Sequence, residues 1–336
     1  MEELFLDDYG MFLGKKSERL VVKKKKEVLK EVPLFKLSKV FITSRGISLS
    51  ADAVEECMKH GIQINFLNFK NEPYAKISSP FLQGTVKTRR AQLIAYNNEK
   101  GKGLAISFVT GKIKNQISML KYMSKYRKKR NPELYDFMCK RIENMEDFLD
   151  QVNQIEGKKV DNIRQRLMTV EAHCAKEYWK TAKKIIPDEA EFTGRETRGA
   201  TDLVNCLLNY GYAILYSQVQ GAIILAGLDP FAGYLHVDRS GRASLVLDLV
   251  EEFRQQMVDR TVFALLNQGT KLKIEEGRLG KKTKRKLRDK LMERLDSYVK
   301  YESKKHKLRV VIQRQARHMA TFLRGERDYE PFVGKW

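Results

Sequence analysis

The sequence predicts an α+β protein in which a β-rich N-terminal domain, residues 1–85, precedes a larger all-α domain, residues 86–336. Three observations lead to this fold class. The first 80 or so residues contain short apolar runs separated by turn residues, as in hairpin-rich sheets. Pro80 and Gly84 then end this pattern. After Thr88, apolar residues recur at helical spacing, with few prolines.

The N-terminal domain is expected to form five strands and one helix. The strands are expected at residues 4–6, 11–13, 20–22, 40–42 and 62–67, and the helix at residues 51–60. A sheet domain of roughly 80 residues buries little apolar surface by itself and leaves strand edges that a partner can cover. This size favours a homodimer that forms through the N-terminal domain.

The C-terminal domain is expected to be built from long helices, one of them over residues 163–184. Residues 203–228 carry no charged side chain and are long enough to span a bilayer. However, amides such as Asn205, Asn209 and Gln218 would be costly in hydrocarbon. We therefore expect a helix buried at the centre of a bundle and no membrane segment.

The charge balance indicates a polyanionic partner. The 336 residues include 64 Lys and Arg against 42 Asp and Glu, a net charge of +22. Basic side chains concentrate in residues 121–130 and 281–290, and Arg195 and Arg198 lie in a glycine-bearing break between two helical stretches. Such runs are usually solvated helix faces. Together with the overall charge, they favour nucleic acid, because neutralised phosphates release counterions.

The sequence gives no sign of secretion or of a disulfide framework. Its four cysteines form no CxxC pair, and its first residues lack the basic and apolar segments of a secretory signal. We expect a cytoplasmic protein.

Glu171 is the first candidate for a functional site. On a helical wheel it falls on the same stripe as Leu167 and Cys174, so its carboxylate is expected to point inward. A buried carboxylate needs a partner. That partner is either one of the many arginines or a bound cation.

His236 and a group of acids supply the other candidates. His236 follows a turn rich in glycine and proline, where a lone histidine is more often structural than a ligand. A helix after Ser240 is expected to carry four acids on one face: Asp248, Glu251, Glu252 and Asp259. That face is either solvated or binds a divalent cation, and carboxylates with imidazole suit Mg²⁺ or Mn²⁺.

Several ordered blocks of the sequence resemble a known family. They are Glu171-Ala172 with Tyr178-Trp179, residues 202–212, Gly227-Leu228-Asp229-Pro230 with Gly233-Tyr234-Leu235-His236, and residues 244–254; residues 46–50 and 61–67 add to them. In order and spacing, these blocks resemble the CRISPR-associated integrase-nuclease that captures new spacers. The resemblance covers nearly the whole chain.

The resemblance implies a fold, partners and a metal site. The fold is a β-rich N-terminal dimerisation domain with a helical catalytic and DNA-binding domain. The partners are DNA, a second copy of the chain and the small second core adaptation protein. The metal and catalytic residues are Glu171, His236 and Glu251, binding Mg²⁺ or Mn²⁺. Some relatives have Asp in place of Glu251, so Asp248 is an alternative or assisting ligand.

The activity that the resemblance implies is phosphoryl transfer. A 3′-hydroxyl of captured prespacer DNA attacks a phosphodiester at the edge of the CRISPR repeat. The expected DNA-backbone contacts are Arg195, Arg198, Lys281, Lys282, Lys284 and Arg285. Two alternatives remain open: a metal-dependent nuclease on branched DNA or RNA without integration, and a non-catalytic nucleic-acid-binding scaffold.

Overall fold

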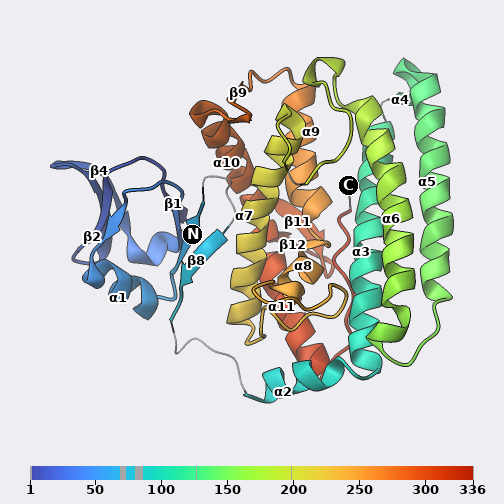
Figure 1. Cartoon of the computed structure of the whole chain (residues 1–336), viewed down its shortest axis with the longest axis horizontal. Coiled ribbons are helices and arrows are strands. Elements are labelled where there is room, and N and C mark those ends of the chain that lie inside the picture. The colour runs from blue at the N-terminus through green and yellow to red at the C-terminus, as the bar shows by residue number, and fades with distance from the viewer. Residues whose placement is uncertain (1, 69–72, 80–85, 126, 198, 336) are drawn as a thin grey trace. The chain divides into compact units, whose positions relative to one another are not determined.

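The computed structural model describes residues 2–68, 73–79, 86–125, 127–197 and 199–335. Within it, the chain divides into two compact units, residues 1–83 and 84–336 (Figure 1). The expected order of a strand-rich unit followed by a mostly helical unit is confirmed.

The described part of the N-terminal unit contains two four-stranded sheets, with strand orders β1-β5-β7-β8 and β4-β3-β2-β6. The strands are β1 (Glu2–Leu6), β2 (Met11–Lys16), β3 (Arg19–Lys24), β4 (Glu27–Pro33), β5 (Leu37–Ile42), β6 (Ser48–Leu49), β7 (Gln63–Leu67) and β8 (Pro73–Ile77). All five expected strands are present. The sequence pattern does not reveal β4, because most of its side chains are exposed and give no apolar alternation.

The N-terminal unit also contains one α-helix, α1 (Ala51–Lys59). The Ser50 side chain begins the helix by accepting a hydrogen bond from the Ala53 N–H. Ala53 and Cys57 then face a core that includes Leu13 and Ile64. The free thiol of Cys57 has its pKa raised to about 12 by burial, and the neighbouring Glu56 carboxylate adds to the rise. This cysteine is therefore an apolar core residue.

The C-terminal unit is built from helices that pack into two groups. In one group, α3 (Glu99–Ser124), α5 (Pro132–Asn153) and α6 (Val160–Ile185) lie side by side; in the other, α7 (Leu203–Leu225) is flanked by α8, α10 and α11 (Figure 1). The remaining α-helices of this unit are α2 (Val86–Ala95), α4 (Arg127–Arg130), α8 (Ser244–Val250), α9 (Arg260–Asn267), α10 (Lys281–Asp296) and α11 (Leu308–Leu323). The unit also contains the short 3₁₀-helix η2 (Asp188–Ala190) and the π-helix η3 (Gln255–Asp259). A second 3₁₀-helix, η1 (Leu34–Lys36), belongs to the N-terminal unit.

Two small hairpins interrupt the helices of this unit, and the expectation of an all-α domain did not include them. They are β9 (Ile274–Glu275) with β10 (Arg278–Leu279), and β11 (Tyr298–Tyr301) with β12 (Lys304–Lys307). Both are short and rich in charged residues, so they lack the apolar alternation by which strands are recognised.

Helix α7 is the buried central helix that the uncharged stretch predicted. Its polar side chains Asn205, Ser217 and Gln218 are all buried within the unit. No helix in the described part of the chain has the length and apolar content needed to cross a membrane.

Helix α7 and η3 approach each other closely at Gly211. A Cβ atom built on Gly211 would lie 2.5 Å from Cγ1 of Val258. Because such an approach is far inside the van der Waals limit, glycine is required for this packing.

Replacing Gly211 by alanine should therefore destabilise the protein. We expect Gly211→Ala to lower the free energy of unfolding by about 1–3 kcal/mol, the usual cost of overpacking a core. Urea denaturation measures this loss. Gly194→Ala is the matched control, because a Cβ atom added at Gly194 would have no atom within 4 Å. Equal stability of the two variants would contradict the close approach.

Candidate active site

Glu171 and Glu251 meet at one amino group, although they come from different elements. Lys112 of α3 donates a hydrogen bond to Oε1 of Glu171 on α6, and its Nζ lies 2.7 Å from Oε2 of Glu251, which follows α8. The three side chains are 12%, 17% and 5% exposed. Two carboxylates 80 residues apart in the chain therefore share one buried positive charge.

Glu251 is the more strongly perturbed of the two acids. Its Oε1 also lies 3.0 Å from the guanidinium of Arg254. Burial raises the pKa of Glu251, but the charges of Arg254, Lys112 and His236 outweigh it and lower the pKa to about 2. Glu251 is thus an anion at any working pH.

His236 is held by Asp248 of α8. The fully buried Asp248 carboxylate accepts hydrogen bonds from the backbone N–H groups of Tyr234, Leu235 and His236, at 2.7, 3.1 and 3.0 Å. Its Oδ1 also lies 2.7 Å from His236 Nδ1. Because the carboxylate is the acceptor in all these contacts, Nδ1 carries a proton, and in the neutral imidazole Nε2 is the nitrogen with the lone pair.

This geometry disfavours Asp248 as the alternative ligand that the sequence left open. With both oxygens occupied by N–H donors, Asp248 has no free oxygen for a cation. Its contact with Nδ1 fixes the orientation of the His236 ring and leaves Nε2 on the opposite side. Asp248 thus holds the His236 loop, and Glu251 is the acid that shares Lys112 with Glu171.

The expectation that Asp248, Glu251, Glu252 and Asp259 share one face of a helix is wrong. Helix α8 ends at Val250, a turn follows, and η3 has the wider i→i+5 spacing. A wheel of 100° per residue does not hold across such a break. As a result, Glu252 and Asp259 have other partners than Lys112. The Asp259 carboxylate accepts hydrogen bonds from the hydroxyls of Tyr178 and Tyr212 at 2.7 and 2.5 Å.

Glu252 is buried beside the C-terminal tail. Its carboxylate accepts hydrogen bonds from the Tyr329 hydroxyl at 2.6 Å, the Phe332 N–H at 2.8 Å and the Gln315 amide at 2.9 Å. Burial raises the pKa of Glu252 to about 7, and these neutral donors lower it only in part. Sequence reasoning missed this network because the partners lie more than 60 residues away.

The basic residues expected to contact DNA have different environments. The Arg195 guanidinium makes its contacts within the chain. It donates hydrogen bonds to Oδ1 of Asn205 and of Asn209, at 2.9 and 2.6 Å. It also stacks on Tyr212, with Cζ 5.3 Å from the ring centroid. Arg195 therefore ties the glycine-bearing break to α7 instead of lying open. Arg198 lies outside the described residues.

Helix α10 presents the other four basic residues. Its apolar side is buried through Leu287, Leu291 and Leu295. Lys281, Lys282 and Arg285 are exposed, while Lys284 is half-buried. Burial, with the nearby charge of Arg278, lowers the pKa of Lys284. The exposed members are therefore the stronger candidates for phosphate contacts.

The donor set at Lys112 fits a divalent cation. Among the described residues, no three His, Cys, Asp or Glu side chains are grouped as a metal site. The Lys112 ammonium instead lies between the two carboxylates, and its angle leaves the buried Oε2 of Glu251 without a directed hydrogen bond. The structure brings Glu171 and Glu251 together at Lys112 but does not group His236 with them. Carboxylate oxygens and imidazole are nevertheless ligand types that Mg²⁺ and Mn²⁺ accept.

Comparison with known proteins gives one family. The family described as "CRISPR associated protein Cas1" matches residues 4–296. The chain is 38% identical to CRISPR-associated endonuclease Cas1 1 of Archaeoglobus fulgidus, with 99% of each chain covered. It is 33% identical to CRISPR-associated endonuclease Cas1 1 of Francisella tularensis subsp. novicida, over the full length of both. A solved casposase bound to its integration product has the same fold, with a TM-score of 0.83, 24% identity, and coverage of 99% of this chain and 93% of that one.

The raised pKa of Glu252 predicts a pH dependence of stability. A carboxyl whose pKa is about 7 when folded, and about 4.3 when unfolded, binds more protons in the folded state between these values. Stability therefore falls as pH rises from about 4.3 to 7, by about 4 kcal/mol. Glu252→Gln should remove this slope in urea denaturation from pH 5 to 8.

The control for this experiment is Glu156→Gln, which changes an exposed carboxylate. We expect its stability to follow that of the unmodified protein at every pH. Parallel curves for Glu252→Gln and the unmodified protein would show that Glu252 titrates normally.

Proposed function

The chain belongs to the Cas1 family of CRISPR-associated endonucleases, and from this premise we propose that it inserts captured foreign DNA as new spacers into a CRISPR array. The reaction is metal-dependent phosphoryl transfer by an enzyme of the endonuclease and integrase class. The single observation that supports the proposal best is the convergence of Glu171 and Glu251 on the Lys112 ammonium, while Asp248 holds His236.

Glu171, His236 and Glu251 would hold Mg²⁺ or Mn²⁺. When bound, such an ion neutralises charge on the reacting phosphate and lowers the pKa of an attacking hydroxyl. The chain prepares this site through electrostatics. Arg254 stays beside Glu251 and keeps it ionised, while Asp248 fixes the imidazole so that Nε2 is available.

In integration, a 3′-hydroxyl of the captured DNA forms a new bond to phosphorus, and the 3′-oxygen of the repeat strand leaves and takes up a proton. No covalent bond to the protein is needed. If His236 does not bind the ion, its Nε2 would instead donate the proton to the leaving oxygen. The buried position of Glu251 limits competing water contacts at its carboxylate.

DNA binding is assigned to the exposed face of α10. Lys281, Lys282 and Arg285, with the half-buried Lys284, would neutralise backbone phosphates. The family also implies the small second core adaptation protein as a partner, and we place the complex in the prokaryotic cytoplasm, where both DNA substrates are found.

Replacing Glu171 tests the catalytic assignment. Glu171→Ala should reduce cleavage and strand transfer in Mg²⁺ or Mn²⁺ by at least about 100-fold, because an anionic ligand is removed. DNA affinity should persist or rise slightly, since one negative charge is removed. Strand-transfer assays at saturating DNA and filter binding measure the two effects. Glu156→Ala is the control.

A reciprocal variant separates binding from chemistry. Neutralising Lys281, Lys282, Lys284 and Arg285 together should weaken DNA binding and flatten its salt dependence by about 0.9 for each phosphate that no longer meets a cation. Turnover at saturating DNA should be retained. If Glu171→Ala keeps metal-dependent turnover, the non-catalytic scaffold becomes the better account. Cleavage without strand transfer in the unmodified protein would support a nuclease that does not integrate.

We also propose that the N-terminal unit forms the homodimer. The edge strand β4 exposes Val28 and Leu29, at 46% and 44%, and Phe35 beside it is 75% exposed. A sheet edge with adjacent apolar side chains is suited to pairing with a second copy. Light scattering at micromolar concentration should give a dimer, and Val28→Lys with Leu29→Lys should shift it toward monomer. A monomeric unmodified protein would contradict this.

A further inference from the structure

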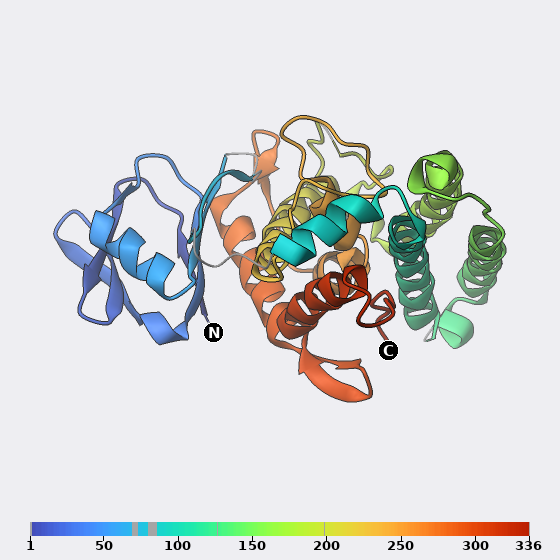
Figure 2. The ribbon, with the colours of Figure 1, turned by 90° about the horizontal axis from the view of Figure 1, so that it is seen from below.

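The hairpin formed by β11 and β12 has two different faces. In its register, Tyr298 is opposite Lys307 and Lys300 is opposite Lys305, while Val299 and Tyr301 belong to the other face. Figure 2 shows this hairpin, in orange-red between α10 and α11, projecting beyond the helices of its unit. None of its residues belongs to the candidate active site.

The inner face is fixed to α11 and to the C-terminal tail. The Tyr301 hydroxyl donates to Oε1 of Gln315 at 2.6 Å and lies 2.8 Å from His318 Nδ1. The Tyr301 ring packs 6.1 Å from that of Phe332, centroid to centroid. These contacts hold one side of the hairpin against the helical unit.

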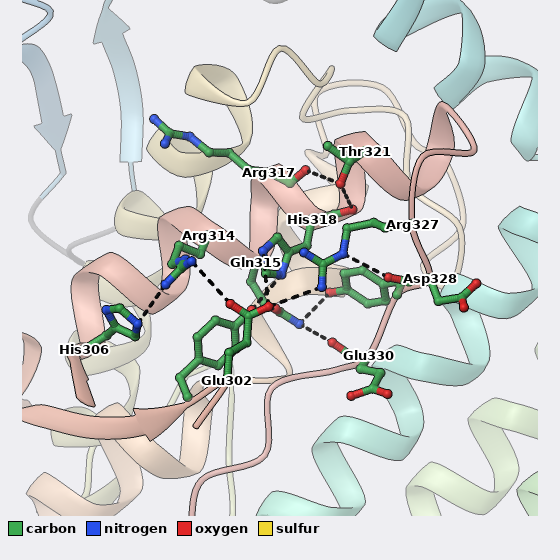
Figure 3. A network of polar contacts seen from close by, with 12 residues as sticks. Glu302, His306, Arg314, Gln315, Arg317, His318, Thr321, Arg327, Asp328 and Glu330 are labelled. Atoms are coloured by element: carbon green, nitrogen blue, oxygen red, sulfur yellow. Dashed lines mark hydrogen bonds and ion pairs between the residues drawn. The ribbon is translucent and has the colours of Figure 1, made fainter. Parts of the chain in front are cut away.

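The turn of the hairpin is held in place by ion pairs. Glu302 and Ser303 have φ values of +46° and +64°, a conformation that costs side-chain-bearing residues energy. The Glu302 carboxylate lies 3.3 Å from Arg327, 3.4 Å from Arg314 and 3.6 Å from His318 (Figure 3). Because three cationic or imidazole groups surround this carboxylate, the hairpin is a pre-organised arm.

The outer face of the hairpin carries lysines whose charge no acidic side chain in the described part of the chain neutralises. Lys300 and Lys305 lie directly opposite each other, a pairing that like charges make unfavourable. Within the described residues, neither lysine makes an ion pair or hydrogen bond, whereas the neighbouring Lys307 contacts Asp296 at 3.3 Å. Tyr298, on the same face, is 65% exposed. A rigid arm that presents two opposed lysines and an aromatic ring lacks an anionic partner.

We propose that this outer face binds nucleic acid, with Lys300 and Lys305 on backbone phosphates and the Tyr298 ring against a base or sugar. The inference rests on the proposed function and adds a contact surface to it. A two-stranded ribbon fits the major groove of a duplex, and an exposed tyrosine fits an unpaired base. The net charge of +22 favours a polyanion over a protein surface.

The test compares DNA affinities of charge-neutralised variants. Fluorescence anisotropy over a salt series, with a duplex and with a single strand, is measured for Lys300→Gln with Lys305→Gln. We expect the slope of log affinity against log salt to fall by about 1.8 on duplex or about 1.4 on single strand, and affinity near 0.15 M salt to fall by at least about tenfold.

A second variant identifies the form of DNA. Tyr298→Ala should weaken single-strand binding by about tenfold if the ring stacks on a base, and leave duplex binding nearly unchanged. A loss on duplex alone would place the ring against the sugar. No loss on either form would remove Tyr298 from the surface.

The matched control is Lys25→Gln with Lys26→Gln, which neutralises two exposed lysines at the turn between β3 and β4. Its affinity should stay close to that of the unmodified protein. Equal losses in both double variants, or no loss in either, would overturn the hairpin assignment.

Other readouts separate this proposal from the proposed function. In the hairpin variant, thermal unfolding should be unchanged or shift slightly upward, since a like-charge pair is removed, and metal-dependent cleavage at saturating DNA should be unchanged. If the unmodified protein binds and cleaves DNA while the hairpin variant binds it equally well, only the hairpin assignment fails. If that variant instead loses a protein partner and keeps DNA affinity, the face is a protein contact and the proposal is wrong. If the unmodified protein neither binds nor cleaves DNA, the proposed function fails first.

Discussion

Two carboxylates that meet in a largely water-excluded site both stay ionised only where positive charge offsets their repulsion, and here the ammonium of Lys112 supplies it. At a separation of about 5 Å and an effective dielectric constant near 20, two unit charges repel by about 3 kcal/mol. Lys112 cancels this repulsion between Glu171 and Glu251, and Arg254 adds a second positive charge beside Glu251. The site is therefore formed by residues from α3, α6 and the end of α8, and the packing of α3 against α6 has to keep them in register.

The other three acids near this site are accommodated by hydrogen bonds. Asp248 accepts backbone N–H groups of the His236 loop, Asp259 accepts two tyrosine hydroxyls, and Glu252 accepts neutral donors from the C-terminal part of the chain. Burial raises the pKa of Glu252 to about 7, and its neutral hydrogen-bond donors lower it only in part. The four acids that the sequence grouped on one face thus have four different sets of partners, and they do not form one common site.

The C-terminal tail links these environments to the rest of the unit. Asn115 of α3 donates to the carbonyl oxygens of Glu252 and Phe332, at 3.0 and 2.7 Å, and accepts the Gly334 N–H at 2.9 Å. Gln315 of α11 joins Glu252 to Tyr301 of the hairpin. The segment that carries Glu251, the tail and the β11–β12 arm are therefore parts of one hydrogen-bonded network, which keeps the arm in a fixed orientation within its unit.

The sequence by itself determined the strand-rich and helical parts, the buried central helix, and the inward position of Glu171. Each depends on spacing along a single element, where 2.0 and 3.6 residue periods apply. The sequence also singled out Glu171, His236 and Glu251. Only the tertiary structure decided that Lys112 and Arg254 neutralise the acids, that Asp248 holds His236, and that Glu252 faces the tail. Those outcomes depend on where α8 ends and on residues far along the chain, and periodicity within one helix carries no information about either.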